Sequence, residues 1–116
     1  MGDRPTYAAT APPIIKVPVE VDTTNCAKVA SELTAACVPG VRTVIADLTQ
    51  TTFCDSSALR VLLQAHRVAE TQGIDFAVAV NSHSVLRVLE ITGLTSILRL
   101  YPSVPAALDA WRRDPA

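Results

Sequence analysis

The sequence predicts an α/β fold in which about four α-helices flank a mixed β-sheet of about four to five strands. Short apolar runs that suit strands alternate along the chain with longer stretches in which apolar residues recur at helical spacing. This alternation favours helices packed on a sheet over a helical bundle or a β-sandwich. With 116 residues, 49% of them hydrophobic, the chain has the size and composition of a single domain with one core.

Four short apolar segments are expected to form strands. Residues 43–48 and 76–80 are mostly apolar without polar alternation, which is typical of strands covered on both faces. The first strand is expected at residues 14–19, although Pro18 lacks a backbone donor and suits an edge. The last strand is expected at residues 96–101.

Four stretches with helical spacing follow or connect these strands. They begin after Asp22, within residues 53–63, near Ser82 or Ser84, and at Ser103. A single glycine follows each of the first three, as is common where helices end. The residues expected on the buried helix faces are Val29, Ala30, Leu33, Ala36 and Cys37; Ala58, Val61, Leu62, Ala65 and Ala69; Val85, Leu86, Val88 and Leu89; and Val104, Ala107, Leu108 and Trp111.

The domain is expected to cover residues 14–113, with a flexible or edge segment at residues 1–13 and a tail at residues 114–116. Four of the eight prolines lie among the first eighteen residues, where they weaken strand pairing. No apolar run reaches the roughly 20 residues that a membrane span requires, and the start lacks the apolar centre of a signal peptide. We therefore expect a cytoplasmic protein that does not insert into a membrane.

Charge and cysteine content argue against several classes of protein. The net charge is −1 and the Lys and Arg residues are scattered, so a nucleic-acid groove is not expected. Cys26, Cys37 and Cys54 form neither an even set nor a C-x-x-C pair, which argues against a disulfide framework or a zinc site. We expect buried thiols, with redox sensing by Cys54 as an alternative.

An enzymatic role is not expected either. No glycines flank Ser56 and Ser57 as they would in a hydrolase nucleophile elbow. His66 lies three turns into the helix that Ser56 begins, and His83 begins another helix, so the sequence places neither beside Ser56. The four glycines are spread singly and form no phosphate loop. We expect no catalytic residue, metal or cofactor of the protein's own.

The motif FCDSSALRVLL at residues 53–63 can hold a helix cap, a phosphorylation site, or both. Asp55, Ser56 and Ser57 are all good N-cap residues, and one such cap contributes about 1 kcal/mol. A phosphate is also tolerated at a helix start, where backbone N–H groups lack partners. It would add about 1.5 to 2 negative charges beside Asp55 and repel a partner that fits the unmodified surface.

Two separated segments make the chain resemble the STAS domains of bacterial anti-sigma factor antagonists. The run IADLTQTTFCDSSALRVLL is similar to the family's strand, polar loop, D-S-S-G motif and helix. The run VNSHSVLRVLEITGLTSILRLYPSVPAAL is similar to its strand, a helix ending in T-G-L, a strand and a helix. In addition, VEVDTTN at residues 19–25 resembles G-E-L-D-x-x-T, with Asp22 at the aspartate. The resemblance covers about residues 14–112.

The resemblance implies a mixed STAS-type sheet with helices on one side and no catalytic activity. In the family, the serine after the aspartate is phosphorylated by a partner that is both anti-sigma factor and serine kinase, which binds the ATP. The unphosphorylated antagonist binds that partner and frees the sigma factor for transcription, and a phosphatase restores it. Carried over, Ser56 is the phosphorylation site and Asp22, Asp55, Ser57 and Ala58 surround it. We expect a monomer or a weak dimer.

The chain departs from the family pattern at two glycines. The glycine of D-S-S-G is Ala58, and that of G-E-L-D is Val19. A methyl group at Ala58 favours the helix but would crowd a kinase that needs close approach to the backbone. The alternative is therefore a STAS domain that is never phosphorylated and serves as an interaction subunit of a signalling scaffold or a membrane transport complex.

Overall fold

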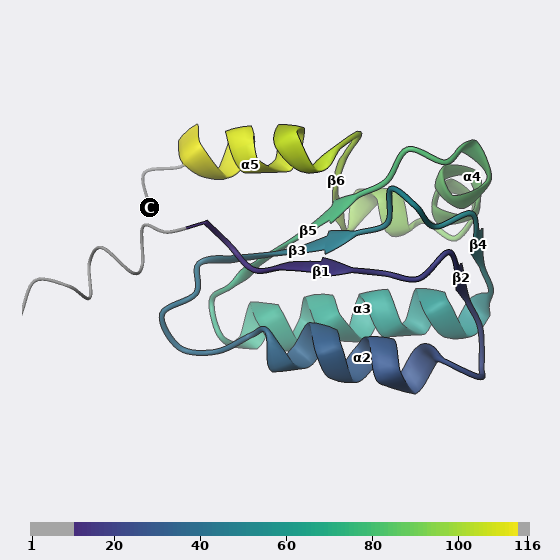
Figure 1. Ribbon diagram of the computed structural model, residues 1–116, viewed down its shortest axis with the longest axis horizontal. Coiled ribbons are helices and arrows are strands. Elements are labelled where there is room, and N and C mark those ends of the chain that lie inside the picture. The colour runs from purple at the N-terminus through teal and green to yellow at the C-terminus, as the bar shows by residue number, and fades with distance from the viewer. Residues whose placement is uncertain (1–10, 114–116) are drawn as a thin grey trace, which may run out of the picture.

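The computed structural model describes residues 11–113, in which a β-sheet lies between two layers of helices (Figure 1). The strands of this sheet, in spatial order, are β1 (Ile14–Lys16), β3 (Thr43–Asp47), β5 (Asp75–Ala79) and β6 (Arg99–Tyr101). A separate ladder joins β2 (Glu20–Val21) to β4 (Phe53–Cys54). The α-helices are α2 (Cys26–Ala35), α3 (Ser56–Thr71), α4 (His83–Ile91) and α5 (Val104–Arg113). The predicted α/β class is confirmed.

All strand pairings of the described residues are parallel. The helices cross over between strands and return the chain to the same end of the sheet, as parallel pairing requires. Over residues 11–113 the predicted mixed sheet is therefore a parallel one. The segments predicted at residues 1–10 and 114–116 lie outside the described residues.

Helices cover both faces of the sheet, so the expectation of helices on one side is wrong. Helices α2 and α3 pack on one face and form the larger core (Figure 1). Helix α5 lies on the other face, where Ala107 packs against Ile45 and Ala77. Successive side chains of a strand point to opposite faces, and β3 and β5 are buried almost throughout. Both faces are apolar, so both need a cover.

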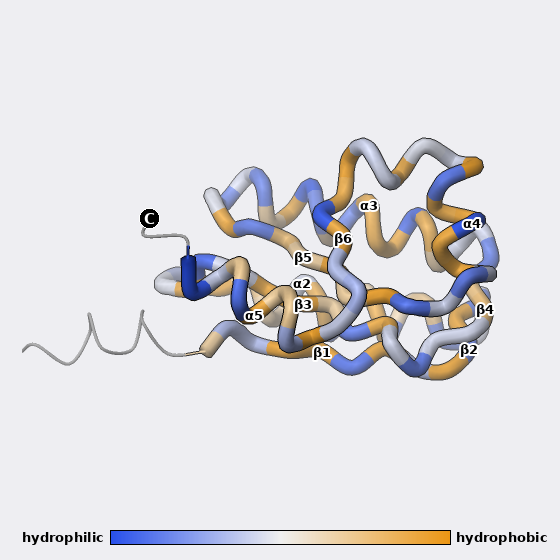
Figure 2. The backbone as a smooth tube through the Cα atoms, turned by 90° about the horizontal axis from the view of Figure 1, so that it is seen from above, coloured by the Kyte–Doolittle hydropathy of each residue, from blue (hydrophilic) through white to orange (hydrophobic). Residues whose placement is uncertain are grey.

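The core follows the predicted helical spacing. Figure 2 shows apolar residues along the central strands and alternating with polar ones along the helices. Most residues predicted on the inner faces of α2, α3 and α4 are buried, and they include Leu33, Ala69 and Leu89 with no exposed surface. Cys37 and Cys54 are buried as expected, whereas Cys26 is half-buried, and all three thiols are free. None of the helices of residues 11–113 is long and apolar enough to span a membrane.

Two predicted strands are shorter than expected. Pro18 interrupts the first, so that β1 ends at Lys16 and β2 starts at Glu20. The last strand starts at Arg99, because Leu94–Ser96 form a 3₁₀ helix. Gly93 enters that turn with a φ of 80°, and the Ser96 hydroxyl donates to the Gly93 carbonyl oxygen at 2.8 Å. This local bond favours the turn over an extended start.

The β2–β4 ladder lies beyond the carboxyl ends of β1 and β3, at the end of the molecule where α2 and α3 begin (Figure 1). The two loops that lead to it are tied together by Thr51, which has no exposed surface and whose hydroxyl donates to the Pro18 carbonyl oxygen at 2.8 Å. The ladder thereby fixes the starts of α2 and α3 next to each other.

Candidate functional site

The register of the β2–β4 ladder brings the two predicted aspartates side by side. Val21 pairs with Cys54, so the next residues along the chain, Asp22 and Asp55, leave the ladder together. The Asp55 backbone N–H donates to the Val21 carbonyl oxygen at 3.3 Å. The pKa of Asp22 lies below its ordinary value mainly because of the Thr24 hydroxyl, and the negative charge of Asp55 opposes this shift, as expected for two neighbouring carboxylates.

Asp55 is the N-cap of α3. One carboxylate oxygen accepts from the backbone N–H groups of Ser57 at 2.9 Å and Ala58 at 3.2 Å, and also from the Ser57 hydroxyl. The hydroxyl donor has the largest effect on the pKa of Asp55, which lies below its ordinary value. Asp55 therefore stays ionised and satisfies two of the backbone donors that a helix start leaves free.

The two serines of the motif differ in exposure and in role. Ser57 is 3% exposed and its hydroxyl is used by Asp55. Ser56 is exposed, and no hydrogen bond to its hydroxyl is found within residues 11–113. The cap of α3 is thus complete without Ser56, which leaves one hydroxyl at the start of the helix accessible to another molecule.

The methyl group of Ala58 points into the core. Ala58 is 2% exposed and belongs to the apolar cluster with Val21, Val61 and Leu62. A partner that approaches Ser56 from solvent would not meet this methyl group. The crowding expected at Ala58 from the sequence therefore has no basis in the side-chain position.

Asp22 is held by its own turn. Its carboxylate accepts from the Thr24 hydroxyl at 2.5 Å and from the Thr24 N–H at 2.9 Å, and the Thr24 hydroxyl is the main cause of a lowered Asp22 pKa. Asn25 stands at the N-cap position of α2, but its side chain accepts from the Asp22 N–H and donates to the Glu20 carbonyl oxygen. The polar residues before α2 thus fix the position of Asp22 rather than cap the helix.

Cys54 is poorly suited to redox sensing. It is 9% exposed, and burial, followed by the charge of Asp55, raises its pKa to about 11. The reactive thiolate is therefore scarce near neutral pH. The alternative role considered for Cys54 receives no support from its surroundings.

The two histidines are not joined to Ser56 in the described part of the chain, which also holds no metal cluster. His66 lies on α3 and His83 starts α4, and no hydrogen bond links either to Ser56. No three acidic, histidine or cysteine side chains of residues 11–113 are grouped as a metal site requires. Near the start of α4, the Ser84 hydroxyl donates to the Thr52 carbonyl oxygen at 3.1 Å. This hydrogen bond ties α4 to the loop before β4.

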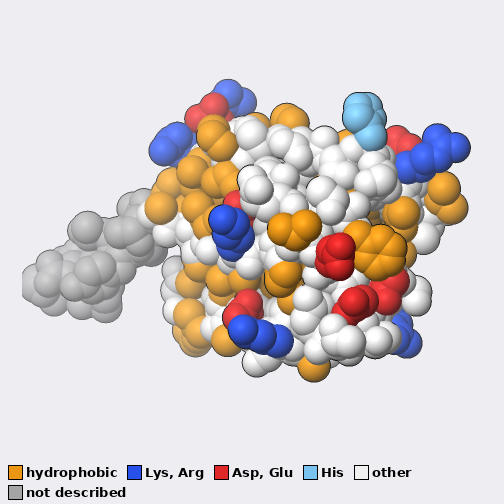
Figure 3. Space-filling model, turned by 45° about the vertical axis from the view of Figure 1, so that its right-hand side comes forward, with side chains coloured by type: hydrophobic (Ala, Val, Ile, Leu, Met, Phe, Trp, Pro, Cys, Tyr) orange, Lys and Arg blue, Asp and Glu red, His pale blue; other side chains and the backbone are white. Residues whose placement is uncertain are grey.

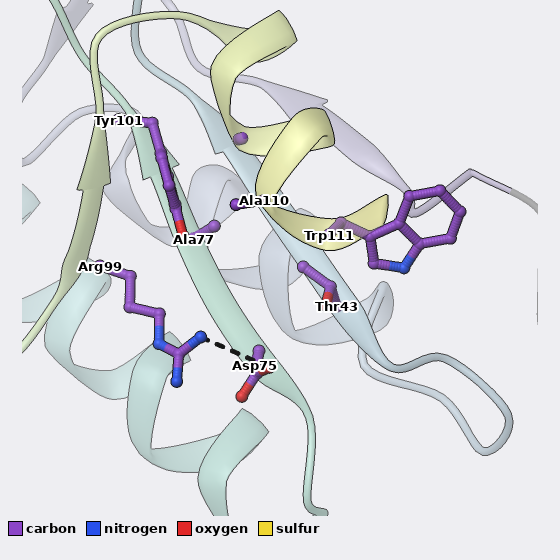
Figure 4. A pocket seen from close by; sticks show the side chains of 8 residues that line it. Thr43, Asp75, Ala77, Arg99, Tyr101, Ala110 and Trp111 are labelled. Carbon is purple, nitrogen blue, oxygen red and sulfur yellow. Dashed lines mark ion pairs between the residues drawn. The ribbon is translucent and has the colours of Figure 1, made fainter. Parts of the chain in front are cut away.

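A small hollow lies elsewhere, between α5 and the sheet face that α5 covers (Figure 4). Its volume is about 60 Å³, and Arg99 reaches towards Asp75 across its opening at 3.7 Å. None of the residues predicted for the functional site lines it. The hollow is therefore separate from the surface around Ser56.

The sequence pattern did not predict the β2–β4 ladder, nor Glu20 and Phe53 as neighbours of the site. Glu20 pairs in register with Phe53, and both are exposed. Each strand of the ladder has two residues, which is too short for an alternation to be recognised. The available signal was the resemblance of residues 19–25 to a family motif, which singled out Asp22 alone.

Comparisons with known proteins place these observations in a family context. A family model, described as the STAS domain, matches residues 6–107. A comparison with curated proteins finds no match.

Several solved structures have a similar fold. An anti-sigma factor antagonist from Mycobacterium paratuberculosis is 23% identical with a TM-score of 0.77, over 85% of this chain and 84% of that one. The phosphorylated form of Bacillus SpoIIAA, an anti-sigma factor antagonist, is 22% identical with a TM-score of 0.67, over 90% and 95%. A sulfate transporter family protein from Wolinella succinogenes is 15% identical with a TM-score of 0.72, over 97% and 96%. At these identities the likeness establishes the fold.

The different roles of the two serines can be measured as stability. We expect Ser57→Ala to lower the free energy of unfolding by about 1 kcal/mol, because it removes a buried hydroxyl that donates to the capping carboxylate. Ser56→Ala, the matched control one residue away, is expected to stay within about 0.5 kcal/mol of the wild type. Urea unfolding followed by circular dichroism measures both. Equal losses in the two variants would show that the cap does not depend on Ser57.

The lowered pKa of Asp55 predicts a pH-dependent contribution to stability. Because the folded-state pKa lies below the unfolded value of about 3.9, ionised Asp55 stabilises the fold above that pH, and the contribution is lost as the pH falls through the folded-state pKa. Asp55→Asn keeps an oxygen acceptor but removes the charge. We expect the stability difference between wild type and variant to be largest near pH 7 and to shrink below about pH 4. A difference that stays constant in urea unfolding across this range would contradict the assignment.

Proposed function

This chain belongs to the STAS domain family, and from that we propose that it is an anti-sigma factor antagonist controlled by phosphorylation of Ser56. In this proposal the unmodified protein binds an anti-sigma factor that is also a serine kinase, and so frees a sigma factor for transcription. The kinase uses ATP to phosphorylate Ser56 and ends the interaction, and a phosphatase restores it. The chain itself acts by binding and has no catalytic residue in this scheme.

The proposal rests on the position of Ser56: its hydroxyl is exposed at the start of α3, and it takes no part in the hydrogen bonds that cap the helix. Asp55 and Ser57 satisfy the start of α3 by themselves. A phosphate on Ser56 would therefore leave the capping hydrogen bonds in place. Modification at this position can change the surface without unfolding the domain, which is what a reversible switch requires.

The charges around Ser56 explain how a phosphate would weaken binding. Asp55 precedes it, and Asp22 lies beside Asp55. A phosphoserine would add about 1.5 to 2 negative charges to these two carboxylates. A partner that fits the unmodified acidic surface would then meet like charge at a cost of several kcal/mol, and a loss of about 3 to 4 kcal/mol corresponds to a 10²- to 10³-fold weaker complex.

The relatives support this proposal at the level of the fold. Similar structures include anti-sigma factor antagonists, one of which is known in a phosphorylated form. The inward position of the Ala58 methyl group removes an objection, since it leaves the solvent side of the motif as open as a glycine would.

A second candidate function is an interaction subunit that is never phosphorylated. It is favoured by the likeness to a sulfate transporter family protein that this chain matches over 97% of its own length. In that case the acidic surface would bind its partner permanently, and Ser56 would have no regulatory role.

Phosphorylation at Ser56 is the first test. We expect mass spectrometry to find phosphate at Ser56 after incubation with ATP and serine kinases from the source organism. The purified kinase is expected to bind Ser56→Ala like the wild type and Ser56→Asp at least about tenfold more weakly, because the added charge meets its surface. Ser31→Asp, an exposed serine on α2, is the matched control and should bind normally. An unmodified Ser56 together with wild-type binding by Ser56→Asp would reject the switch.

The role of Ala58 provides a second test. We expect Ala58→Gly to lower the free energy of unfolding by about 0.5 to 1 kcal/mol, because glycine costs more backbone entropy in a helix. The rate of Ser56 phosphorylation should stay within about twofold of wild type, since the methyl group is buried. Ala65→Gly, also buried on α3, controls for the loss of stability. A large rise in the rate for Ala58→Gly alone would show that the alanine does hinder the kinase.

A further inference from the structure

The β2–β4 ladder and the residue before it expose apolar side chains at the end of the molecule where Ser56 begins α3. Val21 and Cys54 point into the core, whereas Phe53 is 51% exposed and Val19 is 54% exposed. The Val19 carbonyl oxygen accepts from the backbone N–H groups of Thr52 and Phe53, so the backbone of Val19 lies next to that of Phe53. The other phenylalanine of the chain, Phe76, is buried in the sheet. Phe53 thus keeps a large apolar ring in water at the end of the molecule that carries the proposed switch.

Carboxylates surround these apolar side chains. Glu20 pairs in register with Phe53, and Asp22 and Asp55 follow directly where the ladder ends. Figure 3, which turns this end of the molecule forward, shows acidic side chains gathered beside exposed apolar ones. We call this surface the Phe53 face and define it by Val19, Glu20, Asp22, Phe53 and Asp55.

The composition of the Phe53 face indicates what it fits. Strong protein interfaces place aromatic anchors in a dry pocket and charged residues at the rim, where they select partners of opposite charge. A second copy of this chain is disfavoured as the occupant, because symmetric contact would bring three carboxylates against three others. A matching surface has an apolar pocket bordered by lysine or arginine.

We propose that the Phe53 face is the docking surface for the protein partner, with Phe53 inserted into an apolar pocket that has a basic border. This inference rests on the proposed function. Ser56 regulates the interaction there, and the Phe53 face supplies the residues that give the complex its affinity. Ser56 lies three residues after Phe53 and directly after Asp55, so a phosphate there stands at the rim of the buried contact. The anchor supplies binding energy in both states, and the rim charge decides whether the partner can approach.

A first experiment identifies what covers Phe53 in the cell. Phe53 is replaced by the photo-crosslinking amino acid p-benzoyl-L-phenylalanine in the full chain, expressed in its own organism, and the crosslinked protein is identified by mass spectrometry. The same replacement at Ile91, which is 74% exposed at the end of α4, is the control. We expect a crosslink from position 53 that is absent from position 91. No crosslink at position 53, or the same one at both positions, would overturn the proposal.

A second experiment uses the crosslinked protein after purification. We expect Phe53→Ala to weaken its binding about 10- to 100-fold, and Phe53→Leu to recover part of the loss because an apolar anchor remains. Glu20→Gln and Asp22→Asn should slow association and reduce its dependence on salt. Glu70→Gln, an exposed carboxylate at the far end of α3, is the matched control and should leave association unchanged. Thermal unfolding verifies that each variant is folded.

The outcomes separate this proposal from the proposed function. If Phe53→Ala weakens binding to a purified partner that is no kinase, and Ser56 carries no phosphate, the docking surface stands and the antagonist function falls. If Ser56 is phosphorylated and Ser56→Asp binds weakly, but a folded Phe53→Ala binds like wild type, the function stands and the docking surface is wrong.

Discussion

The parallel pairing of β2 with β4 is the constraint on which the candidate site depends. It is only two residues long, yet it sets the register that places Asp22 against Asp55 and lets α2 and α3 start side by side. Thr51 stabilises it from inside, since its buried hydroxyl donates to the Pro18 carbonyl oxygen and so joins the loop before β4 to the segment between β1 and β2. A shift of one residue in this register would turn Phe53 inward and Cys54 outward, because neighbouring residues of a strand face opposite sides.

At the start of α3, two adjacent serines have different roles: Ser57 supports the helix cap, whereas the Ser56 hydroxyl is exposed to solvent. A carboxylate that accepts three donors needs the buried hydroxyl of Ser57, and this requirement hides that group from solvent. The hydroxyl of Ser56 makes no such contribution within the described residues. Two residues of the same type, one position apart, can therefore be altered with different consequences: one through the fold, and the other through the charge of the surface.

The sequence was sufficient for the elements whose residues repeat over several turns or a whole strand. The spacing of Val61, Leu62 and Ala65 identified α3, and the apolar run at residues 43–48 identified β3, because burial requires those patterns. The expectation that all helices lie on one side of the sheet was wrong. The apolar run at residues 43–48 indicates that both faces of the strand are buried, but not which helix covers each face. The β2–β4 ladder was not predictable, because two-residue strands depend on pairing between distant segments. Within the site, the motif named the residues, but only the structure could show that Asp55 is the cap, Ser57 is buried and Ala58 points inward.

The parallel topology also has an electrostatic consequence at the end of the molecule that holds the site. Each helix that follows a strand of a parallel sheet begins at the carboxyl end of that strand, so α2, α3 and α4 all start at this end (Figure 1). The aligned peptide dipoles of a helix place roughly half a positive charge at its start, and several starts together create a positive field. Glu20, Asp22 and Asp55 lie within that field and offset it. The helix starts therefore offset only part of the charge of the three carboxylates, and a doubly charged phosphate would add to the remaining negative charge of the whole end face and not only to that of the side chain that carries it.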